Sequence, residues 1–190
     1  MELLLGVFSA FGLSASAGLN AYIPLLAVGV IAHYFPNTLV LSKPFDLLAN
    51  PWILILLGIL VIIEMVADKI PAVNHINDLI QTVVRPVAGA IAFAASAHVV
   101  TNISPVLALA CGLLVAGSVH TVKSAAVRPA VTAATAGAGN LPVSIAEDIF
   151  ATITSVLALV IPLIMGTIII VLFILVIWWW MNRKEKAQTV

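Results

Sequence analysis

The chain alternates between long apolar runs and short interruptions that contain charged residues or prolines. Six runs can be delimited, at residues 3–33, 52–67, 86–100, 105–119, 124–138 and 149–181. A helix needs about 20 mostly apolar residues to cross a bilayer, so the first and last runs are long enough to span with tilt. The three shorter runs between residues 86 and 138 predict tilted, kinked or partly re-entrant helices. The pattern as a whole predicts an all-α protein with about six transmembrane helices.

Local signals add detail to this pattern. Most prolines fall at or between the runs, but Pro24, Pro129 and Pro162 lie inside runs and predict kinks. Residues 72–84, between the second and third runs, place apolar side chains on one helical face and polar ones on the other. This predicts either a short amphipathic helix at the cytoplasmic membrane surface or a simple connector lying on the lipid.

Composition narrows the class of protein. Apolar residues make up 63% of the 190 residues and charged residues only 8%, against about a quarter charged in a soluble domain. The mean hydropathy is +1.21. A single cysteine, Cys111, excludes a secreted disulfide scaffold. Because Lys+Arg and Asp+Glu both number 8, there is no basic excess for nucleic acid. A polytopic helical membrane protein remains.

The basic residues predict an orientation. If each run spans once, one side of the membrane receives only Lys43, and the other receives Lys69, Arg85, Lys123, Arg128, Arg183, Lys184 and Lys186. Since cytoplasmic loops are enriched in Lys and Arg, this predicts that both termini are cytoplasmic, in a multi-pass protein of the bacterial inner membrane. The main alternative is five spans with residues 124–138 re-entrant.

An internal repeat is suggested by a weak likeness between residues 16–21 and 124–129, which lie in comparable surroundings. Residues 1–182 would then form one membrane domain with two inverted three-helix halves, 1–101 and 104–182, followed by a basic cytoplasmic tail, 183–190. Inverted repeats are common in transporters, whose sites lie near the membrane midplane.

Two carboxylates stand at the end of the second run. Glu64 follows an almost unbroken apolar stretch, and Asp68 lies four positions later on the same helical face. Charged groups at membrane depth are costly, so they need partners or a function. One interpretation is an interfacial carboxylate pair neutralised by Lys69 or Arg85, and the other is a cation or proton site.

A second polar stripe recurs every four residues at His120, Ser124, Arg128 and Thr132, with Lys123 beside it. These residues share one helical face if the fourth and fifth runs are continuous. The natural partners of the Arg128 guanidinium are Glu64 or Asp68 from the first half and Glu147 or Asp148 from the next segment. Such an arginine is either part of a structural salt bridge or a clamp for an anion or carboxylate.

Small residues from Thr132 to Asn140 allow close helix packing or an unwound segment facing a cavity, with Gly18 to Asn20 as a counterpart in the first half. Asn20 and Asn140 are therefore further candidates for substrate or ion binding. No tight metal-ligand spacing, nucleophile elbow or phosphate loop is present, so we expect no metal site, no cofactor and no enzyme.

Three blocks carry a family resemblance. They are residues 14–26 (SASAGLNAYIPLL), residues 64–71 (EMVADKIP) with the following Asn74, Asp78, Arg85 and Pro86, and residues 120–147, which include GAGNLP. In this order they resemble a family of small bacterial integral membrane proteins with a domain of unknown function, the DUF4126 type. The resemblance implies a membrane location and a topology class, and it supplies no substrate.

The charges, short helices and repeat together favour a small transporter or channel-like permease for an ion or small solute. Its expected site lies between the second run and the 105–138 region, with Arg128 and Glu64 as central charges. The alternatives are a non-transporting scaffold, an assembly factor or a protein that handles lipid-linked phosphate. Expected partners are membrane lipids, the unidentified solute and a second copy of the chain. The candidate binding residues are Glu64, Asp68, His120, Lys123, Arg128, Asn20, Asn140 and Glu147.

Overall fold

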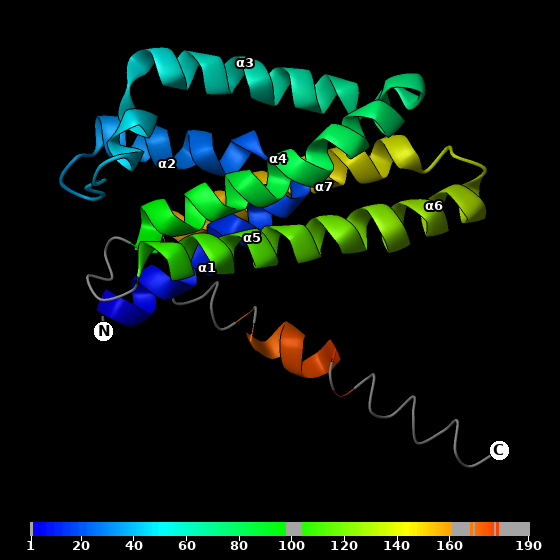
Figure 1. Cartoon of the computed structure of the whole chain (residues 1–190). Helices are drawn as coiled ribbons and strands as arrows, with labels where there is room; N and C mark the ends of the chain where they lie inside the picture. Colours follow the sequence, from blue (N-terminus) through cyan, green and yellow to red (C-terminus); the bar gives the residue numbers. More distant parts are fainter. Residues whose placement is uncertain (1, 98–103, 161–167, 169, 177, 179–190) are drawn as a thin grey trace.

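The computed structural model describes residues 2–97, 104–160, 168, 170–176 and 178, and all regular secondary structure there is helical (Figure 1). The elements are α1 (Glu2–Leu19), α2 (Tyr22–Tyr34), the 3-10 helix η1 (Phe45–Ala49), α3 (Pro51–Ala67), α4 (Pro71–Ala97), α5 (Pro105–Val122), the π-helical turn η2 (Lys123–Val127), α6 (Arg128–Thr135) and α7 (Asn140–Val160). The all-α class is confirmed. The predicted tail at 183–190 lies outside the described residues.

In the described part of the chain, three stretches are long and apolar enough to cross a membrane: Ile76–Ser96, Pro105–Thr135 and Asn140–Val160. Gly6–Leu19, Tyr22–Tyr34 and Pro51–Ala67 are apolar but shorter. At 1.5 Å per residue, α2 is about 20 Å long, less than the ~30 Å hydrocarbon core of a bilayer. The six-span arrangement is therefore not confirmed.

The first apolar run is two helices rather than one kinked at Pro24. α1 ends at Leu19, and α2 runs back beside it from Tyr22 (Figure 1). The Asn20 side-chain oxygen accepts hydrogen bonds from the backbone N–H groups of Tyr22 and Ile23, both at 3.2 Å. Asparagine is favoured at such helix starts for this reason. Pro24 lies in the first turn of α2, where a missing N–H leaves no hydrogen bond unmade.

Two predicted interruptions are absent. The segment at 72–84 and the described part of the next run, 86–97, belong to the single helix α4, which contains Pro86 internally. The runs at 105–119 and 124–138 are likewise joined, since α5, η2 and α6 follow one another without a gap. Proline is tolerated inside membrane helices because neighbouring groups compensate for the missing hydrogen bond. Residues 2–97 thus form four α-helices and 104–160 two continuous helical stretches, so the inverted repeat is not confirmed.

The small residues near the end of α6 form a tight turn rather than an unwound segment. Residues 136–139 connect α6 to α7, and Ala136 (φ 50°) and Gly137 (φ 89°) have left-handed backbone conformations. The Thr135 hydroxyl accepts a hydrogen bond from Gly139 N–H at 2.9 Å. This turn lies at the same end of the bundle as the α3–α4 connection, on the right in Figure 1.

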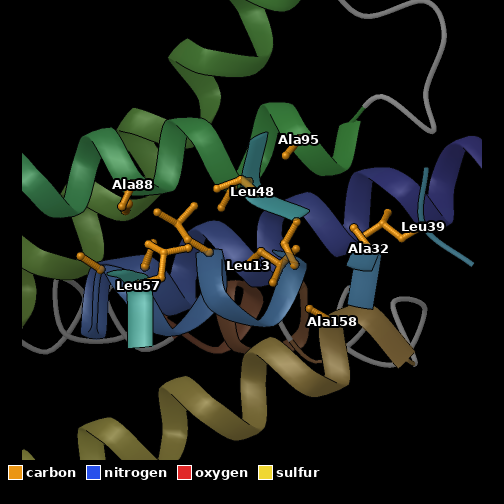
Figure 2. Close-up of a cluster of buried hydrophobic side chains, with 14 residues drawn as sticks. Leu13, Ala32, Leu39, Leu48, Leu57, Ala88, Ala95 and Ala158 are labelled. Atoms are coloured by element: carbon orange, nitrogen blue, oxygen red, sulfur yellow. The ribbon is translucent and has the colours of Figure 1, made fainter. Parts of the chain in front are cut away.

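Helices α1, α4 and α5 approach one another closely through small residues. A Cβ added to Gly89 of α4 would lie 2.3 Å from the Ala116 Cβ of α5, and one added to Gly112 would lie 2.4 Å from the Gly89 oxygen. The Ser14 hydroxyl of α1 lies 3.1 Å from the Gly89 oxygen and 2.8 Å from the Gly112 oxygen. Small residues permit such close approach in membrane proteins. Figure 2 shows the neighbouring apolar cluster, which includes Leu13 and Ala88.

The distribution of polarity is inverted relative to a soluble protein. On α4, Leu79 and Val83 are 74% and 66% exposed, whereas Gln81 and Arg85 are 2% and 0% exposed. An amphipathic helix in water buries its apolar face, so α4 is built for an apolar solvent. The polar face predicted to lie on the membrane surface instead points into the bundle. The exposed apolar surface extends over the other helices and is that of a membrane protein.

Candidate ion-pair network and pocket

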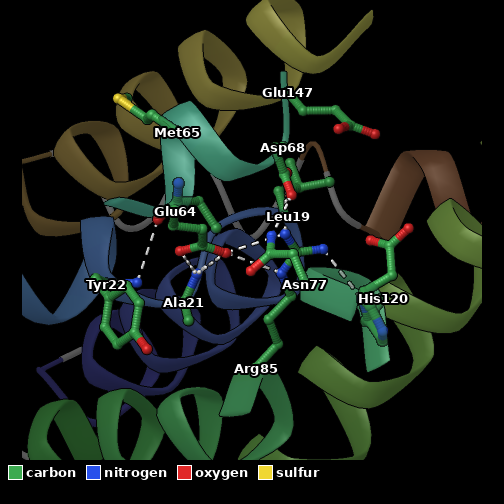
Figure 3. A network of polar contacts seen from close by, with 12 residues as sticks. Leu19, Ala21, Tyr22, Glu64, Met65, Asp68, Asn77, Arg85, His120 and Glu147 are labelled. Carbon is green, nitrogen blue, oxygen red and sulfur yellow. Dashed lines mark hydrogen bonds and ion pairs between the residues drawn. The ribbon is translucent and has the colours of Figure 1, made fainter. Parts of the chain in front are cut away.

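The two carboxylates of α3 are buried and paired. Arg85 Nε and Nη2 lie 3.1 and 3.0 Å from Glu64 Oε1, and Arg85 is completely buried (Figure 3). Glu64 also accepts a hydrogen bond at 3.0 Å from the backbone N–H of Ala21, at the start of α2. The partner of Glu64 is therefore Arg85, one of the two cations expected to neutralise it, and the contacts of Arg128 include Asp68 and Glu147, two of its four expected partners.

Asp68 is the centre of the network. Its Oδ2 lies 3.2 Å from Arg85 Nη2, 3.3 Å from Lys123 Nζ and 3.1 Å from Arg128 Nη2. The other carboxylate oxygen accepts a hydrogen bond from Asn77. Burial by itself would raise the pKa of the Asp68 carboxyl, but Lys123, Arg85 and Arg128 together hold that pKa below its ordinary value. One carboxylate thus joins cations from α4, η2 and α6.

Helix α7 completes the network. Glu147 Oε2 lies 2.9 Å from Lys123 Nζ and 3.2 Å from Arg128 Nη2. The adjacent Asp148 pairs with Lys69 at 2.7 Å and accepts a hydrogen bond from the Asn20 amide at 3.1 Å. The hydrogen bond from Asn20 holds α7 against the break between α1 and α2, and the ion pairs hold α7 against η2, α6 and the α3–α4 connection.

His120 connects the network to α4 in a defined protonation state. Its Nδ1 lies 3.1 Å from Arg85 Nη1, and its Nε2 lies 3.2 Å from the Thr82 hydroxyl oxygen. A guanidinium only donates, so Nδ1 must accept and the imidazole is neutral with its proton on Nε2. The Thr82 hydroxyl then accepts from His120 and donates to the Asp78 backbone oxygen at 2.8 Å.

The break between α1 and α2 presents two helix ends to these charges. Glu64 lies at the N-terminal end of α2, and Lys123 Nζ lies 3.0 Å from the Leu19 carbonyl oxygen at the C-terminal end of α1. Each charge has the sign that the helix dipole favours at that position. The broken helix pair is therefore electrostatically matched to the network.

The π-helical turn explains why Lys123 and Arg128 act together. In a regular α-helix, residues five positions apart point in directions about 140° apart. Here the Arg128 N–H bonds to the Lys123 carbonyl oxygen, which is the i→i−5 bond of a π-helix and holds one extra residue in the turn. Both side chains consequently reach Asp68 and Glu147. The four-residue spacing predicts Ser124 in the same polar stripe as Arg128. Its hydroxyl instead contacts the Thr121 carbonyl oxygen of its own helix.

A pocket of about 570 Å³ adjoins the network at the end of the bundle where α6 turns into α7. Asp68, Asp78 and Arg128 carry its charges together with Lys69. Its remaining lining residues are Ser124, Pro129, Thr132, Ala133, Gly137, Asn140 and Leu141. The pocket gives the buried charges access to the space outside the bundle.

Seven of the eight candidate residues lie in or against the network: Asn20, Glu64, Asp68, His120, Lys123, Arg128 and Glu147. The eighth, Asn140, lines the pocket but hydrogen-bonds Thr132 of the α6–α7 turn. Binding of a substrate by these residues stays a prediction. Within the described part of the chain, no group of three or more His, Cys, Asp or Glu side chains is placed to hold a metal ion.

Sequence reasoning missed the central role of Arg85 and left Asn77, Asp78 and Asp148 out of the site. The sequence pattern indicates Arg85 only as one of two cations that neutralise the carboxylate pair. The four-residue spacing of Asn77, Gln81 and Arg85 is a usable signal, because it places three polar groups on one face of a continuous helix. The assumption that a new helix begins at Pro86 concealed it.

The bundle has an apolar outer surface, inward-facing charges and helices long enough to cross a membrane, which together are typical of a helical membrane protein. Its charges form a buried ion-pair network. The chain belongs to the family with the Domain of unknown function (DUF4126), whose profile matches residues 7–182. This confirms the resemblance seen in the sequence. No match was found among the curated proteins or among the solved structures with which the chain was compared.

Proposed function

We propose that the protein is a small transporter or channel-like permease that moves an ion or small charged solute through the pocket beside Asp68 and Arg128. The observation that carries this proposal is that a pocket of about 570 Å³ reaches a buried charge network inside a bundle with an apolar surface. Ionisable groups at membrane depth mark solute and ion pathways in membrane proteins.

The break between α1 and α2 supports the same function. In many transporters, discontinuous helices direct their ends at a site near the membrane midplane. Here the ends at Leu19 and Ala21 contact Lys123 and Glu64, two members of the network. The solute pathway would therefore pass the helix break and the π-helical turn.

The charges also support an orientation. Lys69, Arg85, Lys123 and Arg128 gather toward the end of the bundle that holds the pocket, whereas Lys43 lies in the loop at the opposite end (Figure 1). Because cytoplasmic segments of membrane proteins are enriched in basic residues, the pocket would open on the cytoplasmic side of a bacterial inner membrane. Because α1 starts at the opposite end, the N-terminal end of α1 would face outward, which revises the orientation expected from six spans.

The test is flux through the purified full chain in proteoliposomes, with sodium, potassium, chloride, phosphate and small carboxylates as probes. Arg128→Gln should reduce flux to that of empty vesicles. Ala133→Phe, which fills the pocket without removing a charge, should do the same, and the neighbouring Ala134→Phe, outside the pocket lining, should not. Absence of flux for every probe in the wild type would count against transport.

A structural role is the second candidate, and the extensive pairing of the network favours it. Glu64 and Arg85 both have fully buried side chains and lie 3.0 Å apart. If Glu64→Gln and Arg85→Gln each lower stability, the double variant restores it and the wild type moves no probe, the pair serves folding and the protein is a scaffold. Loss of flux in correctly folded single variants supports transport.

A further inference from the structure

Asp78 and Lys69, two charged residues of the pocket lining, retain the capacity to bond a ligand. The buried Asp78 Oδ1 has no hydrogen-bond partner among the described residues, and Oδ2 lies 3.7 Å from Arg128 Nη1, beyond hydrogen-bond distance. Lys69 Nζ donates to the Met65 carbonyl oxygen at 2.9 Å and to Asp148 at 2.7 Å. An ammonium has three N–H donors, so one remains on Lys69 within the described part of the chain. The pocket thus offers an acceptor and a donor of opposite charge.

A second acceptor without a donor lies next to Asp78 on α4. Gln81 is 2% exposed, and its Oε1 also has no hydrogen-bond partner in the part of the chain that the structure describes. Side chains three positions apart are neighbours on a helix, so the two acceptors lie close together. Because unpaired buried acceptors cost free energy, this side of the pocket favours a ligand that brings N–H donors.

The balance of charge in the pocket determines what else such a ligand carries. Asp68 and Asp78 are negative whereas Lys69 and Arg128 are positive, so the charges of the lining cancel. A cation without a counter-charge would be repelled at Asp78 by the nearby Arg128 guanidinium. An anion without a counter-charge would be repelled at Lys69 by the two carboxylates of the same lining. A molecule that carries both charges avoids both penalties, because each of its ends meets an opposite charge.

We propose that the pocket binds a small zwitterion, an amino acid whose ammonium bonds Asp78 and whose carboxylate bonds Lys69. That this zwitterion is the transported solute rests on the proposed function, whereas its binding rests on the pocket alone. The volume of about 570 Å³ lies within the range of about 300–1,000 Å³ that is typical of small-molecule sites. Pro129, Ala133 and Leu141 supply apolar wall, which favours a short aliphatic side chain on the ligand.

The test is isothermal titration calorimetry of the full chain in nanodiscs of phosphatidylglycerol and phosphatidylcholine, whose headgroups carry no ammonium N–H. L-Alanine should bind. Alaninamide, which lacks the carboxylate, and N-acetylalanine, which lacks the ammonium, should each bind at least about tenfold more weakly, the factor that one charge-assisted hydrogen bond is worth. Glycine betaine, which has no N–H to donate to Asp78, should likewise bind more weakly than glycine. Absence of alanine binding, or equal binding of a single-charge analogue, overturns the proposal.

Matched variants assign the two ends of the ligand. Asp78→Asn and Lys69→Gln should each weaken alanine binding by about tenfold or more. Asp46→Asn and Lys43→Gln make the same changes at exposed positions in the α2–α3 connection, at the opposite end of the bundle, and should leave binding unchanged. Circular dichroism reports whether each variant is folded. Unchanged alanine binding in a folded Asp78→Asn or Lys69→Gln protein overturns the assignment.

Flux of alanine into proteoliposomes separates this proposal from the transport function. If alanine binds through both of its charges but the wild type moves neither alanine nor any ionic probe, the zwitterion site stands and transport falls. If the wild type moves an ionic probe but does not bind alanine, transport stands and the amino-acid assignment is overturned. Binding of glycerophosphoethanolamine without binding of alanine assigns the pocket to a lipid headgroup and also overturns it.

Discussion

The same faces of α4 and α5 are built in two different ways along their length. Toward the pocket end they carry Arg85 and His120, with Arg85 Nη1 3.1 Å from His120 Nδ1. One turn closer to the other end of the bundle, α4 carries Gly89 and α5 carries Ala116. At the glycine level the backbones approach so closely that an added Cβ would overlap the neighbour. The comparison shows how a membrane protein can hold charges at fixed distances: small residues set the helix separation, and long side chains fill the adjoining space.

Substitutions in the charged region should lower the free energy of unfolding more than substitutions in the small-residue region. Replacing Arg85 by Ala leaves Glu64 buried without its cationic partner, and breaking a buried pair in this way costs about 3–5 kcal/mol of unfolding free energy. The measurement is equilibrium unfolding in detergent, followed by circular dichroism. Lys43→Ala, at an exposed position at the other end, is the control. A loss no greater than that of the control would show that the network adds little to stability.

A substitution in the small-residue region should cause an intermediate loss of stability, smaller than that of Arg85→Ala. Gly112→Ala places a Cβ 2.4 Å from a backbone oxygen of α4, and overpacking of this kind costs about 1–3 kcal/mol. Gly58→Ala is the matched control, because nothing lies within 4 Å of the added Cβ and alanine favours the helix by up to about 1 kcal/mol. The two variants should therefore shift the melting temperature in opposite directions. Equal shifts would mean that α4 and α5 can separate freely.

The rim of the network, at the partly exposed Lys69, should be the place where a substitution lowers stability least. Lys69 has a side chain 29% exposed and pairs with Asp148, whose side chain is 8% exposed and keeps a hydrogen bond from the Asn20 amide, so Lys69→Gln should cost less than Arg85→Ala. Added salt should reduce the difference between Lys69→Gln and the wild type, because the partly exposed Lys69 is screened more than the buried Arg85. The same salt should leave the effect of Arg85→Ala unchanged. Identical salt responses would contradict the division between buried and rim charges.

The class of protein could be predicted from the sequence, because the length of the apolar runs and the small number of charged residues are properties of the whole chain. The membership of Glu64, Asp68 and Lys123 in a common cluster could also be predicted, since charges in apolar helices must find partners. Their pairing could not. It depends on Arg85, which is brought inward by a helix that continues through Pro86, and on the π-helical turn, which changes the directions of the residues after Lys123.

The break at Asn20 marks a second limit of sequence reasoning. An unbroken apolar run predicts a single span, and only the tertiary contacts of the run decide that the chain reverses there. Those contacts are the Asp148 bond to the Asn20 amide and the Glu64 bond to Ala21 N–H, made by residues more than 40 positions away. The prediction of a kink at Pro24 placed the irregularity within a turn of its true position but assigned it to the wrong residue.

The π-helical turn also has a consequence for chain length. It contains one residue more than an α-helical turn, so removal of Ala125 would leave Lys123 and the arginine four positions apart, which is one face of a plain α-helix. A deletion elsewhere in α5, at Gly117 for example, would rotate everything that follows by about 100°. Lys123–Val127 is therefore the point at which this helix can be shortened by one residue without loss of side-chain register, and we expect length differences between related chains to be accommodated there.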